Sequence, residues 1–152
     1  MHGIDPEVIE RFSHCQGCSH QELRDASGIS QIVKGQVDDY IFSPVGYSLN
    51  AIEGKHYSTI HITPEAQGSY ISFETNACPP GQQVSCAEKV VQVFKPLSFD
   101  LVLFNNKTIE RPHFSSFNLK RQYAQNLASG YAAQYFSFYQ PDPEVQRPVN
   151  LE

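Results

Sequence analysis

The chain of 152 residues has no apolar run of membrane-spanning length and no cluster of basic residues. A membrane-spanning helix is therefore not expected. The formal net charge is −5, and without a basic cluster to displace counterions from phosphates the chain is not expected to bind nucleic acid. The N-terminal sequence MHGIDPEVIERF lacks the charged, apolar and cleavage regions of a signal peptide. These absences predict a cytosolic protein.

Cysteine is scarce, with four residues in the chain. In a reducing compartment these are expected to be free thiols. Cys15 and Cys18 form a single CxxC motif, but Cys78 and Cys86 are not spaced as the second pair that a four-ligand zinc site needs. We therefore expect a loop with ordinary thiols there and no metal site.

Helices are predicted at the start and in the middle of the chain. Asp5-Pro6 opens a short amphipathic segment that is typical of a proline-initiated helix. Ser19 followed by Glu22 is a capping-box pattern, which predicts a second helix ending near Gly28.

A third helix is predicted from a capping box at Ser85 and Glu88, ended by Pro96. The sequence then favours a strand at SFDLVLFNN and a last strand at YAAQYFSFY, while LKRQYAQNLA between them fits helix or strand. The proline-rich residues 141–152 are expected to form a loose tail after a half-domain of residues 1–140.

From Tyr40 onward the hydrophobic period changes to two, which indicates strands. The sequences DYIFSP and VGYSLN are interpreted as one long strand bent at Pro44 and Gly46. HYSTIHIT and SYISFET follow as two strands of a meander. Strands thus dominate, and the pattern predicts an α+β fold with an antiparallel sheet and helices on one face.

The meander aligns three polar side chains on the face without the isoleucines. A turn centred on Gly54 and Lys55 places Ser48 opposite His61, and a turn centred on residues 67–68 places His61 opposite Glu74. Such a row is compatible with a Ser-His-acid hydrolase. However, GYSLN is not the GxSxG elbow, and serine and histidine on a half-exposed sheet face more often bond only to neighbours.

Longer motifs carry a more specific signal. FSPVGYSLN, TIHITPE, SYISFETN, a helix ending in VVQVFKP, and LFNN occur in this order, after GIDPEVIERF and DASGI. This series closely resembles the C-terminal half of eukaryotic S-adenosylmethionine decarboxylase over residues 3–106, and the later residues resemble it weakly.

The resemblance implies one half of an αββα four-layer sandwich and a pyruvoyl-dependent carboxy-lyase. The family decarboxylates S-adenosylmethionine to supply spermidine and spermine biosynthesis. Its pyruvoyl group arises by autocatalytic cleavage at a Glu-Ser bond and forms a Schiff base with the substrate amine.

By motif, Ser48 and His61 match the family's pair that assists self-cleavage. Phe42 matches an aromatic residue that stacks on adenine, and Glu65 matches the carboxylate that binds the ribose hydroxyls.

Three further residues match the family's putrescine site. Glu74 corresponds to a buried acid, and Phe104 and Tyr131 correspond to aromatics that line the site. Putrescine is thus a possible activator.

Parts of the family's pattern are missing from the sequence. No Glu-Ser dipeptide occurs, so the pyruvoyl precursor is absent, and Met1 aligns past the middle of the family's chain. The expected interpretation is a fragment of a decarboxylase that is inactive alone and needs the N-terminal half. The alternatives are a non-catalytic module that binds a full-length decarboxylase, or a homodimeric half-molecule that binds an adenosyl ligand.

Overall fold

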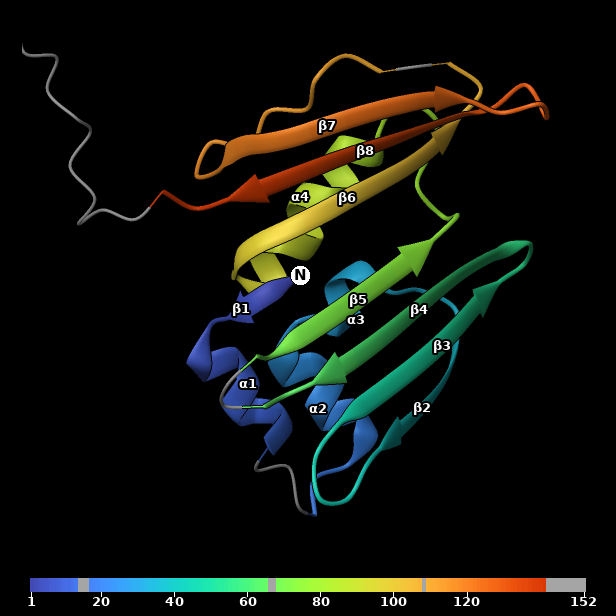
Figure 1. The fold of residues 1–152 in the computed structure, drawn as a ribbon. Coiled ribbons are helices and arrows are strands. Elements are labelled where there is room, and N and C mark those ends of the chain that lie inside the picture. Colours follow the sequence, from blue (N-terminus) through green and yellow to red (C-terminus); the bar gives the residue numbers. More distant parts are fainter. Residues whose placement is uncertain (14–16, 66–67, 108, 142–152) are drawn as a thin grey trace, which may run out of the picture. The chain divides into compact units, whose positions relative to one another are not determined.

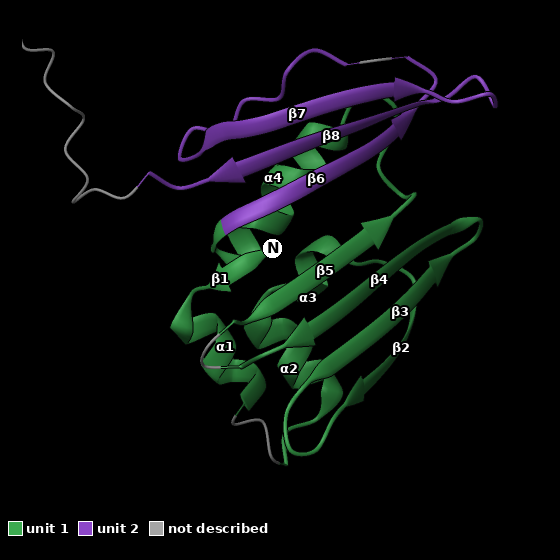
Figure 2. Cartoon of the chain, viewed as in Figure 1, with its two compact units in different colours: residues 1–97 green, residues 98–152 purple. Residues whose placement is uncertain are grey.

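The computed structural model describes residues 1–13, 17–65, 68–107 and 109–141. The chain divides into two compact units, Met1–Leu97 and Ser98–Glu152 (Figure 2). Within the described residues, no helix combines the length and the apolarity that crossing a membrane would require.

The first unit is an antiparallel sheet with helices on one face (Figure 1). Its strands lie in the order β2-β3-β4-β5-β1. In chain order its elements are β1 (His2–Ile4), α1 (Pro6–Ser13), α2 (His20–Ser27), α3 (Ile29–Ile32), β2 (Gln36–Ile41), β3 (Tyr47–Glu53), β4 (His56–Thr63), β5 (Tyr70–Thr75) and α4 (Gln83–Phe94).

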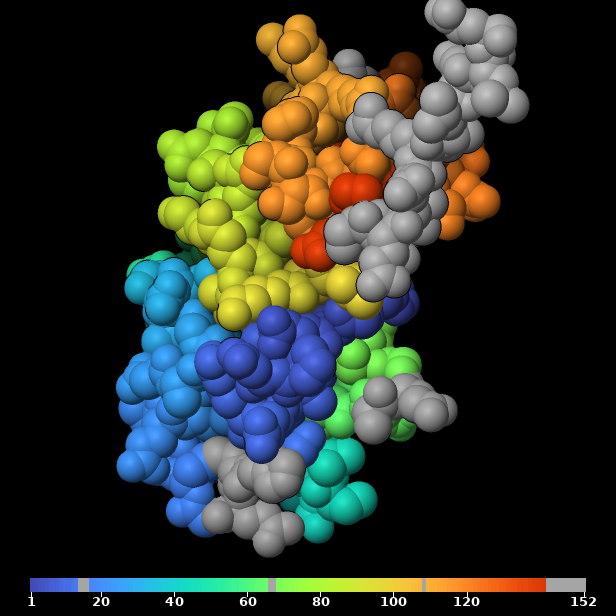
Figure 3. Space-filling model, turned by 90° about the vertical axis from the view of Figure 1, so that its left-hand side faces the viewer, coloured from blue at the N-terminus to red at the C-terminus, as the bar shows by residue number. Residues whose placement is uncertain are grey.

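The core of this unit lies between the helices and the sheet. Phe12 of α1 packs its ring 5.6 Å from that of Tyr47, and Leu49 and Ile60 on neighbouring strands are fully buried. Figure 3 shows the helical side, where the dark-blue residues of α1 adjoin the lighter-blue residues of α2. Among the residues described for this unit, no helix lies on the opposite face of these strands (Figure 1).

The helix signals at the start of the chain are confirmed. The Asp5 carboxylate accepts the Glu7 N–H at 2.8 Å as α1 begins. Ser19 and Glu22 form both bonds of the capping box of α2, and Gly28 ends that helix with a φ of 83°. Glycine suits this position because a positive φ costs it no steric clash.

The predicted start of α4 was wrong. The helix begins at Gln83, with Gln82 as N-cap and no side-chain cap bond, and Ser85 lies inside it. A turn closed by the Gln82 N–H and the Pro79 carbonyl, at 3.0 Å, brings the chain into the helix three residues before the capping-box pattern. Val90 and Phe94 form the buried stripe as expected.

The prediction of one long strand bent at Pro44 was also wrong, because the chain reverses there. β2 and β3 pair antiparallel from Gln36–Ile52 to Ile41–Tyr47. The Phe42 N–H donates to the Gly46 carbonyl at 2.9 Å, and Gly46 adopts a φ of 132°. A period-two pattern is the same on both sides of a hairpin, so periodicity could not distinguish a bend from a reversal.

One of the two predicted registers is correct. β3 and β4 pair Ser48 with His61, as the turn at Gly54 requires. In β4 and β5, however, His61 pairs with Ser72, and Glu74 pairs with Thr59. The shift of two residues leaves every side chain on its predicted face. The turn residues 66–67 lie outside the described residues.

The second unit is a smaller antiparallel sheet in the order β6-β8-β7, built from β6 (Pro96–Asn105), β7 (Asn118–Asn126) and β8 (Ala132–Tyr139). The first two residues of β6 belong to the first unit. The ambiguous segment LKRQYAQNLA is therefore mostly strand. Phe99, Phe114 and Phe138 pack with ring centroids 4.9–5.0 Å apart. The expected tail lies almost wholly outside the described residues.

Candidate active site

A row of side chains crosses the uncovered face of the first unit. The register pairs Tyr40 with Ser48, Ser48 with His61, and His61 with Ser72, on four neighbouring strands. Directly opposed residues in an antiparallel sheet hold their Cβ atoms about 5 Å apart. The row therefore brings a hydroxyl, an imidazole and a phenol ring to one place.

Ser48 and His61 are in direct contact. The Ser48 Oγ lies 3.2 Å from His61 Nδ1, and the His61 side chain is on the exposed face. A hydroxyl and an imidazole at hydrogen-bond distance can exchange a proton, and the hydroxyl can also donate to a developing oxyanion. The predicted pair is thus assembled by the fold.

Phe42 and Glu65 lie at the same end of the sheet as this pair. Ile41 pairs with Tyr47, and Tyr47 pairs with Ile62, so the chain just beyond β2 is close to the chain just beyond β4. Gly46 is close to both segments, because a Cβ added to it would lie 3.3 Å from the Phe42 side chain and 3.6 Å from the Ile62 carbonyl oxygen. Glu65, exposed, follows β4 by two residues.

Tyr40 belongs to the site although sequence reasoning did not select it. Its ring centroid is 4.8 Å from that of Phe42, in an edge-to-face arrangement, and both side chains are about half exposed. The signal was present, since a residue two before Phe42 in an extended strand shares its face. Ser72 was missed because the predicted register assigned its place opposite His61 to Glu74.

Glu74 shares the face but not the row. It pairs with Thr59, two residues along β4 from His61. Two residues of strand correspond to about 7 Å, and the shift leads away from the end where Phe42 and Glu65 lie. Glu74 and His61 therefore lie at different positions along the same sheet face.

Phe104 and Tyr131 belong to the second unit. Phe104 pairs with Ala133, and Tyr131 directly precedes β8, so both lie at the same end of that sheet. Their side chains are 64% and 49% exposed. Two bare aromatic rings at one end of a strand pair can provide the apolar wall of a binding site.

Asp39 organises the other face of the same strands, and sequence reasoning missed it. Its carboxylate accepts hydrogen bonds from Arg24 and from the Tyr47 hydroxyl, and His20 Nδ1 lies 2.8 Å away. Burial alone would raise the pKa of Asp39, but the hydrogen bonds from Tyr47, His20 and Arg24 outweigh it and lower that pKa. Burial, together with Asp39, raises the pKa of Tyr47. This cluster attaches α2 to β2 and β3 beneath the site.

The cysteines do not all match the expectation. Cys78 and Cys86 are free thiols, but Cys18 is disulfide-bonded, which the low cysteine count could not reveal. Cys15 lies outside the described residues. Among the residues that are described, no group of three or more histidine, cysteine or acidic side chains is arranged to hold a metal ion.

The fold and site define an α+β protein with a serine–histidine pair and an aromatic pair on an uncovered sheet face. The profile of one family, described as adenosylmethionine decarboxylase, matches residues 1–145. The chain belongs to this adenosylmethionine decarboxylase family.

Named relatives give the extent of the similarity. The S-adenosylmethionine decarboxylase proenzyme of Xenopus laevis is 42% identical over 110 residues, which are 71% of this chain and 32% of the relative. That of Dictyostelium discoideum is 40% identical over 105 residues, 68% of this chain and 27% of the relative. The crystal structure of the Trypanosoma brucei AdoMetDC-delta26 monomer has a TM-score of 0.82 at 25% identity and covers 93% of this chain and 63% of its own.

The aligned part of this chain thus spans about a third or less of the length of these curated relatives. The α+β fold class predicted from the sequence is confirmed.

Proposed function

We propose that this chain is the C-terminal half of a pyruvoyl-dependent S-adenosylmethionine decarboxylase and is inactive by itself. The observation that carries the proposal is the 3.2 Å contact between Ser48 and His61, inside the family motifs and next to Phe42. The family match over residues 1–145 supports it.

Ser48 and His61 act first in self-cleavage of the proenzyme. His61 moves a proton as a Glu-Ser amide on the N-terminal half rearranges to an ester and is eliminated, and the Ser48 hydroxyl donates to the transient oxyanion. The pyruvoyl group, once formed, supplies a carbonyl that accepts the electrons released with carbon dioxide. The partly exposed pair fits such a group, because both polar atoms lie on the uncovered face.

Substrate binding uses the same end of the sheet. Phe42 stacks on the adenine ring, with Tyr40 packed edge-on against it, and the two oxygens of Glu65 accept hydrogen bonds from both ribose hydroxyls. An aromatic face near the sulfonium also favours its positive charge. These contacts would hold the adenosyl end of the substrate so that its amino group is free to form the Schiff base with the pyruvoyl carbonyl.

Putrescine is the proposed activator, and each unit carries residues that match the family's putrescine site. In the first unit, Glu74 would supply a negative charge for an ammonium group. In the second unit, the rings of Phe104 and Tyr131 would contact apolar parts of the ligand. The displacement of Glu74 from the His61 row supports a separate role from the catalytic pair.

The N-terminal half of the decarboxylase is the proposed partner of the uncovered face. Tyr40, Ile52, Tyr57 and Tyr70 on that face are 43–62% exposed. Exposed aromatic and aliphatic side chains on a sheet face without helices are typical of a surface that packs against another protein. We place the assembled enzyme in the cytosol.

Coexpression with a polypeptide that carries the Glu-Ser half of a family decarboxylase tests the proposal. We expect self-cleavage and release of carbon dioxide from carboxyl-labelled S-adenosylmethionine, and neither from this chain alone. His61→Ala should slow self-cleavage at least tenfold, since general acid–base groups contribute about 10²–10⁴-fold.

Thr59→Ala is the matched control, because Thr59 lies on the same strand and face, one row away from His61. It should leave self-cleavage within about twofold of the unaltered protein. If both halves fold and bind each other but no cleavage or decarboxylation follows, the proposal is wrong.

A second candidate is a non-catalytic module that binds an intact decarboxylase and changes its rate. The absence of any Glu-Ser dipeptide together with the uncovered face favours it. A full-length family enzyme whose kinetics are unchanged by saturating amounts of this chain would exclude it. The third possibility, a homodimer that binds an adenosyl compound, predicts a dimer at micromolar concentration.

A further inference from the structure

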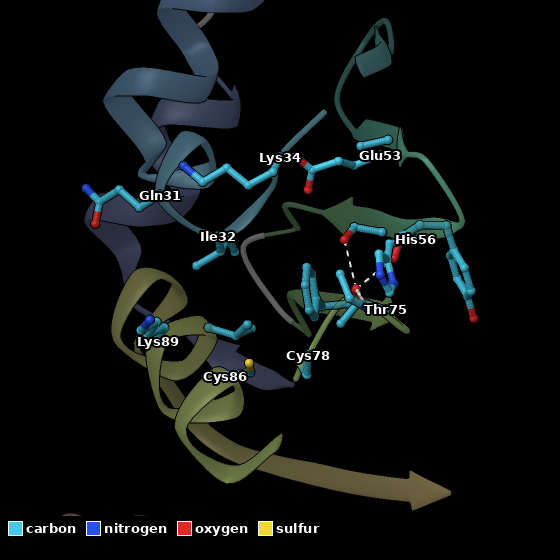
Figure 4. Close-up of a pocket in the computed structure, with 15 residues that line it drawn as sticks. Gln31, Ile32, Lys34, Glu53, His56, Thr75, Cys78, Cys86 and Lys89 are labelled. Carbon is cyan, nitrogen blue, oxygen red and sulfur yellow. Dashed lines mark hydrogen bonds between the residues drawn. The ribbon is translucent and has the colours of Figure 1, made fainter. Parts of the chain in front are cut away.

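Two free thiols face each other on the helix side of the first unit, away from Ser48 and His61. Cys78 and Cys86 line a cavity of about 190 Å³ together with Ala51, Phe73 and Val90. Figure 4 shows Cys86 on α4 and Cys78 among the residues that line this pocket. Cys86 is close enough to Cys78 for a side-chain hydrogen bond between them to contribute to raising the pKa of Cys78.

The chain on both sides of the thiols is fixed. Before Cys78, the Thr75 hydroxyl donates to the Tyr57 carbonyl at 2.7 Å, and the Asn76 side chain accepts the Tyr57 N–H at 2.7 Å. The turn from Pro79 to Gln82 then reverses the chain. Folding therefore determines the distance between the two sulfurs.

Cys86 is anchored by the helix that carries it. It lies in the first turn of α4, where its N–H donates to the Gln82 carbonyl at 2.9 Å. Val90, one turn further on, and Phe94 are buried in the core and hold this helix against the sheet. The thiol thus has a fixed direction and is not a mobile surface group.

We propose that Cys78 and Cys86 are a reversible dithiol–disulfide site that ties the end of β5 to the start of α4. The oxidant is the disulfide of a low-molecular-weight thiol, such as oxidised glutathione. The Cys86 thiolate attacks one sulfur of the oxidant, whose S–S bond breaks and releases one thiol. Cys78 then gives up its proton and attacks the Cys86 sulfur, which releases the second thiol. Two protein thiols are oxidised as one small disulfide is reduced.

The order of attack follows from the surroundings of Cys78. Burial and the hydrogen bond with Cys86 raise the pKa of Cys78 to about 12, although Lys89 opposes this shift. Cys78 therefore remains a protonated thiol at neutral pH and is a poor first nucleophile. It is well placed as the resolving thiol, since Cys86 lines the same pocket and interacts with the Cys78 side chain.

Folding and the disulfide are thermodynamically linked. If the native fold holds the thiols together, the equilibrium constant for forming the disulfide is higher in the native chain than in the unfolded chain. The disulfide must then raise the equilibrium constant for folding by the same factor. Both factors are measurable on the unaltered full chain, so no variant has to fold for the test to work.

The test equilibrates the full chain with graded ratios of oxidised to reduced glutathione, in native buffer and in concentrated urea. Differential alkylation and peptide mass mapping then quantify a Cys78–Cys86 linkage. We expect half-oxidation of the native chain at a ratio at least tenfold lower than in urea. The urea midpoint of the oxidised chain should rise correspondingly, because cross-linking restricts the unfolded state.

Two variants test the proposed placement of the two thiols and the order in which they attack. Cys78→Ser should accumulate a stable mixed disulfide at Cys86, since no resolving thiol remains. The double variant Ser85→Cys/Cys86→Ser keeps the number of thiols but turns one by about 100° around the helix. It should lose the tenfold preference for the native state.

Three results would overturn the proposal. These are equal oxidation in native buffer and in urea, a mixed disulfide that persists on the unaltered chain, or a lower urea midpoint after oxidation.

Discussion

At the scale of single residues, Asp39 shows how one buried carboxylate holds several elements in place. Its side chain is 6% exposed and accepts hydrogen bonds from α2 and from Tyr47 of β3. Replacing it with alanine leaves Arg24 and the Tyr47 hydroxyl without their acceptor in a buried place. We expect Asp39→Ala to lower the free energy of unfolding by about 2–4 kcal/mol.

Asp38→Ala is the matched control for this prediction. Asp38 carries the same charge, but its side chain is exposed on the opposite face of β2. Its removal should change stability by no more than about 0.5 kcal/mol. Urea unfolding followed by circular dichroism compares the two. Equal losses for the two variants would contradict the role given to Asp39.

The same carboxylate predicts a pH dependence. The folded-state pKa of Asp39 is lowered, so the unfolded chain takes up the proton first as the pH falls. The stability that Asp39 contributes is complete above the unfolded-state pKa of about 3.9 and is lost as the pH falls through the folded-state value. The stability difference between the unaltered protein and Asp39→Asn should therefore be constant from pH 7 to pH 5 and shrink below about pH 4. A difference that grows on acidification would have the wrong sign.

At the scale of elements, the edge strand β2 depends on Gly35, which precedes it. Gly35 has a φ of 91°, and a Cβ there would lie 2.3 Å from the Ile52 carbonyl oxygen of β3. Gly54 in the β3–β4 turn also has a positive φ, 62°, but a Cβ there would meet nothing within 4 Å. A comparison of substitutions at the two glycines therefore distinguishes the cost of backbone strain from the added cost of steric overlap.

Substitution by alanine tests this difference. Gly54→Ala should cost about 1 kcal/mol from the left-handed backbone alone. Gly35→Ala should cost about 3 kcal/mol or more, because β2 must also move away from β3. Since Tyr40 pairs with Ser48 across this hairpin, Gly35→Ala should also weaken the proposed self-cleavage. Equal urea midpoints for the two variants would disprove the steric argument.

At the scale of the whole molecule, the uncovered face of the first unit dominates the expected behaviour in solution. Tyr40 and Ile52 on that face are 61% and 62% exposed. We expect the chain alone to self-associate at micromolar concentration, because apolar area transferred from water contributes about 25 cal/mol per Å².

Size-exclusion chromatography with light scattering measures this self-association. The double variant Tyr40→Ser/Ile52→Ser should shift the chain toward monomer and weaken binding of the N-terminal half about tenfold or more. Val45→Ser, which alters an exposed side chain in the β2–β3 turn, should do neither. A soluble monomer of the unaltered chain would contradict the prediction.

Local signals in the sequence were enough to predict much of the fold, but they did not select Tyr40, Ser72 or Asp39. Features that depend on only a few neighbouring residues were predictable. These are the capping box of α2, the proline start of α1, the Gly54 turn and the inward face of β4. The roles of Phe42, Glu65, Glu74, Phe104 and Tyr131 came only from the resemblance and stay predictions. Their motifs identify residues, but they do not measure how those residues lie relative to a ligand.

The sequence by itself determined which side chains share a face, because alternation along an extended strand has a period of two whatever the register. Only the tertiary structure decided which residues oppose each other, that the chain reverses at Gly46, and that Asp39, Tyr47 and Arg24 meet. These outcomes depend on loop geometry and on contacts between distant segments. A register shift of two residues, as between β4 and β5, preserves the whole hydrophobic pattern and therefore leaves no trace in it.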